Sequence, residues 1–112
     1  DNNEWSIANS LENVARNNVE SVVRIEQQEV QDTVFPTCDG LAANLYRHIV
    51  IPFAPSFVQS VVPGGVILVS GILKYDKDEV AAPFLDCGCT IIESLAETEW
   101  CAIAFRTPEL AQ

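Results

Sequence analysis

Basic side chains, histidine and long apolar runs are scarce in this chain of 112 residues. Sixteen acidic residues against six basic ones give a formal net charge of -10, which argues against a nucleic-acid partner and suits a basic protein partner. The alternative is that the charge serves only solubility. No apolar stretch reaches the roughly 20 residues that a membrane-spanning helix needs. With 48% apolar residues, the sequence predicts one globular domain and no membrane span.

Several motifs that would identify a catalytic or ligand site are also missing. Neither phosphate-binding loop, Gly-x-Gly-x-x-Gly or Gly-x-x-x-x-Gly-Lys, occurs in the sequence. Four cysteines and a single histidine, His48, lack the spacing of a zinc site, and nothing pairs a thiol with the imidazole. We therefore expect no metal site and free, buried cysteines, including those of Cys87-Gly88-Cys89; disulfides are the less favoured alternative.

The chain also has no methionine and begins at Asp1. A translation product normally begins with methionine, so we expect this chain to have been processed, trimmed or excised. No signal peptide is recognisable in it. No internal repeat, low-complexity segment or linker composition divides it.

What the sequence does contain is an alternation of strand and helix patterns. The stretch VVPGGVILVSGIL joins a turn signal, Pro63-Gly64-Gly65, to an apolar run typical of a strand buried on both faces. We expect the turn to end a helix and the strand to begin at Val66. The predicted elements begin with a helix within 2–18, a strand at 22–25 and a strand within 38–46 that ends at the polar Asn44. A helix at about 48–62 follows, with Pro52 and Pro55 in its first turns, and then a strand at 66–72. The last elements are a helix at 76–86 closed by Gly88 and strands at 90–97 and 100–106. This order predicts an α/β open sheet with an antiparallel hairpin at its edge.

Asn44 is the polar residue that this pattern singles out. It follows an apolar strand, and open α/β sheets bind their ligands at the carboxyl ends of the strands. An amide carbonyl oxygen at that point can orient a substrate amine without adding a charge. The alternative is a capping or turn residue that leads into the next helix.

Four stretches in one order resemble a known family: CDGLAANLY, then FAPSFVQSVVPGGVILVSGIL, then DCGC, and finally ETEWCAIAFR. They are similar to the carboxyl-terminal part of the PrmA family, the bacterial methyltransferases of large-subunit ribosomal protein eleven. A fifth stretch at the amino terminus, DNNEWSIANSLENVARNNV, resembles the family's segment after its second strand. The resemblance covers nearly the whole chain. It implies a partial Rossmann-like class I methyltransferase sheet, with residues 1–112 as the carboxyl-terminal portion of a single domain.

The resemblance also implies S-adenosylmethionine as the methyl donor and assigns residues to it. Asp1 matches the acidic residue that bonds the ribose hydroxyls at the end of the family's second strand. Asn44 matches the polar residue that faces both the donor and the substrate amine, so it is the expected catalytic residue as well. Gln28, or its neighbour Gln27, is expected near the adenine, although the segment IEQQEV departs from the family pattern.

On the same resemblance, Leu45 and Tyr46 are expected to contact the substrate, a basic ribosomal protein methylated on lysine or amino-terminal amines in the cytoplasm. A related methyltransferase with another amine substrate, such as a mitochondrial protein lysine, stays open. The family's first strand and glycine-rich donor loop would precede Asp1, and its first two strands would lie in the middle of the sheet. We therefore expect the isolated chain to be inactive. The alternative function is a non-catalytic binding or structural module that completes its sheet with a partner chain, or self-associates, through open edges.

Overall fold

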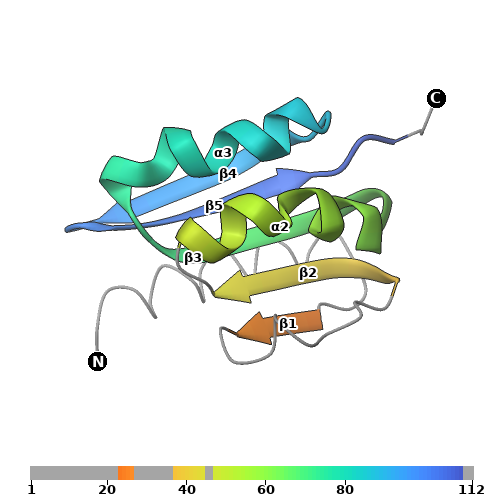
Figure 1. The fold of residues 1–112 in the computed structure, drawn as a ribbon, viewed down its shortest axis with the longest axis horizontal. Coiled ribbons are helices and arrows are strands. Elements are labelled where there is room, and N and C mark those ends of the chain that lie inside the picture. Colours follow the sequence, from red (N-terminus) through yellow and green to blue (C-terminus); the bar gives the residue numbers. More distant parts are fainter. Residues whose placement is uncertain (1–22, 27–36, 45–46, 110–112) are drawn as a thin grey trace.

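The computed structural model describes residues 23–26, 37–44 and 47–109 (Figure 1). Within them, five strands form one sheet in the order β1-β2-β3-β5-β4. The strands and helices are β1 (Val23–Glu26), β2 (Cys38–Asn44), α2 (Arg47–Ser60), β3 (Val61–Leu73), a 3-10 turn η1 (Lys74–Asp76), α3 (Lys77–Asp86), β4 (Thr90–Glu97) and β5 (Trp100–Arg106). β1, β2 and β3 are parallel, whereas β5 is antiparallel to both β3 and β4. The predicted α/β sheet with an antiparallel carboxyl-terminal hairpin is confirmed.

Helices α2 and α3 pack on one face of this sheet (Figure 1). Their apolar residues recur every three or four positions, so one side of each helix reaches the sheet. Rings of α3 and β5 stack there, with the centroids of Phe84 and Phe105 4.6 Å apart. The helix residues fully buried in this core are Val50, Ala54, Phe57, Val80 and Phe84. Alternate strand residues lie in a second, smaller cluster on the opposite face, formed by Leu68, Ala102 and Ala104 with Ala42, Ile92, Leu95 and Trp100 packed against them.

The prediction that Pro63-Gly64-Gly65 ends the second helix is wrong. The helix ends at Ser60, and β3 begins at Val61 and includes the turn signal. Val61 pairs with Cys38, but the next pairing joins Val66 to Gly40, so the Pro-Gly-Gly residues bulge out of the β2–β3 ladder. Gly64 supplies the left-handed backbone of the bulge, with a φ of 76°.

Long-range hydrogen bonds hold this bulge, which explains why Pro63-Gly64-Gly65 stays within β3 and does not reverse the chain direction. The Thr107 hydroxyl donates to the Val62 carbonyl oxygen at 2.8 Å and accepts from the Gly65 amide at 2.9 Å. Arg106 donates from its guanidinium to the Gly64 carbonyl oxygen, 2.8 Å away. The end of β5 therefore fixes the start of β3.

The two prolines of α2 also differ from expectation. Both were expected in the first turns, but the helix begins at Arg47, which places Pro52 and Pro55 in its interior. Each proline removes one backbone donor from the helix. Both lie exposed on the side of α2 away from the sheet, where the carbonyl groups that lose those donors can bond to water.

The carboxyl-terminal half follows the sequence closely. α3 ends at Asp86, and Gly88 has the left-handed φ of 95° that the helix end requires. Backbone donors of the turn close it, since the amides of Cys87 and Cys89 both reach the Phe84 carbonyl oxygen at 3.1 Å. The hairpin strands have the predicted bounds, and β4 carries a bulge between Ile91 and Glu93.

β1 lies directly beside β2, with Val23 paired to Leu41 and Glu26 paired to Asn44. The family's first two strands, expected before Asp1 and in the middle of the whole sheet, are not needed for this pairing. In the described residues the sheet is continuous from β1 to β4. Among the helices described, none is long and apolar enough to cross a membrane. The helix predicted within 2–18 lies outside the described residues.

Candidate functional site

A row of polar residues crosses the sheet where its parallel strands end. Glu26 of β1 is in register with Asn44 of β2, which is in register with Ser70 of β3. Neighbouring strands are about 4.8 Å apart, so the Asn44 and Ser70 side chains start close together. Because ligands of open α/β sheets bind at this edge, the row marks the candidate site.

Both side chains point to the face of the sheet opposite α2 and α3. In β2, Ala42 packs in the second cluster, and Asn44, two residues later, projects to the same side. In β3, Leu68 packs in that cluster and Ser70 follows it in the same way. Asn44 is partly exposed, whereas Ser70 is only 5% exposed. Asn44 is therefore more accessible to a ligand than Ser70.

β3 carries a bulge directly after Ser70. Gly71 has a φ of 81°, and β3 gains one residue on β5 between Val69 and Ile72. This bulge with a left-handed glycine lets Ile72 return to the helix side of the sheet, where it is buried. The bulge thus interrupts the regular β3–β5 pairing next to Ser70, and the pairing resumes at Ile72.

An ion pair joins the starts of the two helices at the same edge. The Arg47 guanidinium lies 3.1 Å from a carboxylate oxygen of Glu79 and 3.5 Å from one of Asp76. The Arg47 side chain is 50% exposed, so such a pair contributes at most about 1 kcal/mol. Its geometric effect is to hold the first residue of α2 against the start of α3.

The rim around this edge is acidic. Asp78 and Glu79 occupy the first turn of α3, and Glu97 and Glu99 flank the turn between β4 and β5. The Lys74 amide donates to the Glu99 carbonyl oxygen at 2.9 Å, which joins the two segments. In Figure 1 the arrowheads of β1 and β2, the start of α3 and the β4–β5 turn all lie on the left. Lys74 and Lys77 lie at the same edge and Arg47 pairs with Glu79, so the edge carries both signs of charge with acidic side chains in excess.

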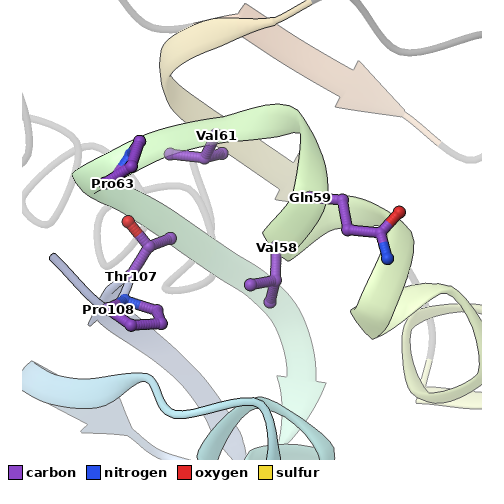
Figure 2. Close-up of a pocket in the computed structure, with 6 residues that line it drawn as sticks. All are labelled: Val58, Gln59, Val61, Pro63, Thr107 and Pro108. Carbon is purple, nitrogen blue, oxygen red and sulfur yellow. The ribbon is translucent and has the colours of Figure 1, made fainter. Parts of the chain in front are cut away.

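A pocket of about 340 Å³ lies at the opposite edge (Figure 2). Its lining comes from the end of α2, the start of β3 and the segment after β5: Val58, Gln59, Val61, Pro63, Thr107 and Pro108. None of these side chains is ionisable, and the Thr107 hydroxyl is already bonded to the β3 bulge. This pocket has no groups for acid–base or nucleophilic chemistry and is separate from the Asn44 edge.

All four cysteines are free, and three of them are buried. Burial raises the pKa of the Cys89 thiol to about 11, with a smaller effect of the neighbouring Cys87. Burial also raises the pKa of Cys101, against a lowering effect of Lys77, and that of Cys38, where Asp39 adds to it. Within the described ranges, no three His, Cys, Asp or Glu side chains are arranged to hold a metal ion.

We expect iodoacetamide to alkylate Cys87 first and Cys89 far more slowly at pH 8. A rise in pKa from 9.0 to about 11 lowers the thiolate fraction of Cys89 about 100-fold, and burial blocks access further. The unfolded chain releases the proton of the Cys89 thiol near pH 9, and the folded chain only near pH 11. The free energy of unfolding therefore falls as the pH rises from about 9 to about 11. Peptide mass spectrometry after timed alkylation measures the order. Equal rates at Cys87 and Cys89 in the folded protein would contradict it.

Of the site residues predicted from the sequence, the structure describes Asn44 and places it at the carboxyl edge. Ser70 beside it was not predicted. A serine within an apolar strand has the pattern of a small core residue, and only the strand register brings it next to Asn44. The other predicted positions, Asp1, Gln27, Gln28, Leu45 and Tyr46, lie outside the described residues.

Comparison with known proteins identifies the relatives of this chain. The ribosomal protein L11 methyltransferase from Heliobacterium modesticaldum is 30% identical over 106 residues, 95% of this chain and 34% of the relative. The one from Geotalea uraniireducens is 33% identical over 95 residues, 85% of this chain and 30% of the relative. The chain thus spans about a third of the length of these relatives.

The fold has a solved counterpart. The crystal structure of the ribosomal protein L11 methylase from Lactobacillus delbrueckii subsp. bulgaricus matches 62% of this chain and 36% of its own. The TM-score is 0.58 at 18% sequence identity, which shows a shared fold. The model of the family described as ribosomal protein L11 methyltransferase (PrmA) matches residues 1–108. The resemblance found in the sequence is confirmed, and this chain belongs to the ribosomal protein L11 methyltransferase (PrmA) family.

Proposed function

We propose that this chain is part of an S-adenosylmethionine-dependent methyltransferase that modifies lysine or amino-terminal amines of ribosomal protein L11. The observation that carries the proposal is the family match over residues 1–108, combined with Asn44 at the carboxyl edge of the sheet. Since the chain spans about a third of its relatives, the proposal concerns the natural full-length product that contains it. We place that product in the cytoplasm.

The described part of the chain fits a donor and an amine at one point. Asn44 offers a partly exposed amide at the carboxyl edge, and the remaining donor contacts, Asp1 and Gln28, stay predictions. When bound, S-adenosylmethionine would supply the methyl group of a sulfonium, so that transfer exchanges a carbon–sulfur bond for a carbon–nitrogen bond and the amine loses a proton.

Asn44 would face the donor and would also act on the substrate amine. Its carbonyl oxygen accepts an N–H of the substrate nitrogen, which aims the nitrogen lone pair at the methyl carbon. An uncharged acceptor suits this role, because a carboxylate would hold the amine in its protonated, unreactive form. Leu45 and Tyr46 follow Asn44 in sequence and are the proposed substrate contacts.

Charge supports a basic protein as the substrate. The chain carries a net charge of -10, and Asp78, Glu79, Glu97 and Glu99 lie around the proposed site. Such a rim attracts a lysine-rich surface and repels phosphate backbones, so we propose a direct protein contact without nucleic acid.

The deciding experiment is a methyl-transfer assay with the full-length product, purified L11 and labelled S-adenosylmethionine, with calorimetric titration of S-adenosylhomocysteine alongside. Labelled L11 supports the proposal. Donor binding with transfer only to another amine protein would retain the reaction and replace the substrate. No donor binding by a folded full-length protein would contradict the proposal.

That last outcome favours the second candidate, a non-catalytic binding or structural module. The observation in its favour is the direct pairing of β1 with β2, which makes the described sheet continuous without further strands. Self-association through the β4 edge is disfavoured by the bulge after Ile91 and by exposed Glu93 and Glu97, which are features of protected edge strands.

A further inference from the structure

Tyr75 places a large aromatic ring in solvent at the carboxyl edge of the sheet. It is the middle residue of η1, the turn between β3 and α3. The residue is 80% exposed, whereas Leu85 is 46% and Leu73 37% exposed. Burial of the ring therefore contributes little to the described fold. Aromatic residues are enriched where one protein binds another, so this ring is a candidate contact for a partner.

The backbone on both sides of this ring is anchored. The Lys74 amide donates to the Glu99 carbonyl oxygen at 2.9 Å, which ties the start of η1 to the β4–β5 turn. At the other end of η1, an Asp76 carboxylate oxygen lies 3.5 Å from the Arg47 guanidinium at the start of α2. A tyrosine has few side-chain torsions, and an anchored backbone leaves little further entropy to lose on binding. The ring is thus presented in a largely preorganised form.

A cation already approaches the ring in the free protein. The Lys74 ammonium nitrogen lies 5.9 Å from the centroid of the Tyr75 ring. This distance is within the range of about 6 Å over which the negative face of an aromatic ring attracts a cation. Asp76 and Asp78 follow at the start of α3, and Glu99 lies at the turn that η1 contacts. Acidic side chains in excess add to the attraction, so the surroundings of the ring select an ammonium or guanidinium group.

We propose that Tyr75 is a docking contact for the basic protein substrate, an inference that rests on the proposed function. Its ring face receives a lysine or arginine side chain of the substrate other than the amine that is methylated, and the Lys74 ammonium gives way to it. Ser70 is in register with Asn44, and Tyr75 follows Ser70 five residues later, a span of at most about 17 Å. A standard interface covers about 800 Å² on each partner, a patch about 30 Å across, so a protein bound at Asn44 also covers Tyr75.

The test is steady-state methyl transfer to L11 by the full-length product, with labelled S-adenosylmethionine and variants at position 75. Tyr75→Leu keeps apolar bulk but removes the ring, and we expect it to raise the KM for L11 about threefold to fivefold, the size of an exposed cation–π contact. Tyr75→Phe keeps the ring face and should have the KM of the wild type. Because the ring touches no reacting atom, kcat and the KM for the donor should be unchanged in both variants.

Lys74→Gln tests the exchange of cations. It frees the ring face and also removes one positive charge that repels a basic substrate. Both effects lower the KM for L11, but only the first depends on the ring. We therefore expect Lys74→Gln to lower this KM about twofold when Tyr75 is present and clearly less in the Tyr75→Leu background. Equal changes in both backgrounds would overturn the exchange, because Lys74 would then act by charge alone.

Leu85→Ala is the matched control, because it removes another exposed large apolar side chain, at the opposite end of α3. It should leave KM and kcat unchanged. The inference is overturned by a wild-type KM in Tyr75→Leu or by equal rises in Tyr75→Leu and Tyr75→Phe. A lower melting temperature of Tyr75→Leu with unchanged KM also overturns it, since the ring then packs against another part of the full-length product. A wild-type product that binds the donor but transfers no methyl group to L11 contradicts the proposed function itself, and the docking contact with it.

Discussion

Replacing Asn44 by alanine is expected to lower kcat for methyl transfer about 100-fold, because misplacing a reacting group by about 1 Å has effects of that size. The fold should tolerate the change, since Asn44 is the last residue of β2 and is partly exposed. Stopped-time incorporation of labelled methyl groups by the full-length product measures kcat, and a denaturation curve measures stability. A variant with wild-type kcat would remove Asn44 from the site.

Asn44→Asp is the sharper comparison because it keeps the size of the side chain and adds a negative charge. A carboxylate beside the substrate nitrogen stabilises the ammonium form and raises the pKa of the amine. The variant should therefore be slow at pH 7 and recover as pH rises, whereas Asn44→Ala should stay slow at all pH values. Parallel pH profiles for the two variants would contradict the proposed contact with the amine.

Replacing Gly65 by alanine is expected to destabilise the chain by about 3 kcal/mol or more, the range of severe overpacking. An added Cβ would lie 2.5 Å from the Asp39 carbonyl oxygen and would also overlap Cγ1 of Val61. Backbone atoms of the neighbouring strand cannot yield as a flexible side chain does. The same change would displace the Gly65 amide from the Thr107 hydroxyl.

Gly64→Ala is the matched control, one residue away and with open space around it. Its added Cβ would meet nothing closer than Cγ of Glu109 at 3.8 Å, so only the left-handed φ of 76° opposes alanine. That conformation costs about 1–2 kcal/mol. Urea denaturation of both variants gives the comparison. A larger loss of stability for Gly64→Ala than for Gly65→Ala would contradict the close packing of the bulge against β2.

Local sequence patterns were sufficient wherever local interactions decide the structure. The hairpin strands Thr90–Glu97 and Trp100–Arg106 have their predicted bounds because apolar alternation and a polar turn define them. Gly88 ends α3 as predicted, since its left-handed backbone follows from helix-end geometry. Asn44 could be predicted for the same reason, as a polar residue at the end of an apolar strand.

The errors and omissions arise where distant residues decide. Pro63-Gly64-Gly65 has the pattern of a helix stop, but hydrogen bonds from Arg106 and Thr107 hold it within β3. Ser70 looks like a small core residue until the register sets it beside Asn44. The local sequence cannot predict either feature, because both depend on which strands lie next to each other in the sheet.

The hydrogen bonds between the start of β3 and the end of β5 also set the order in which the chain can fold during its own synthesis. They join residues 42 to 45 positions apart. The ribosome must therefore release Arg106, Thr107 and Pro108 before the Pro-Gly-Gly bulge has any partner. Contacts of such separation form late, after the local helices. Until then Val61 can pair with Cys38 of β2, but the Pro63-Gly64-Gly65 bulge that follows lacks the hydrogen bonds that hold it in the folded protein.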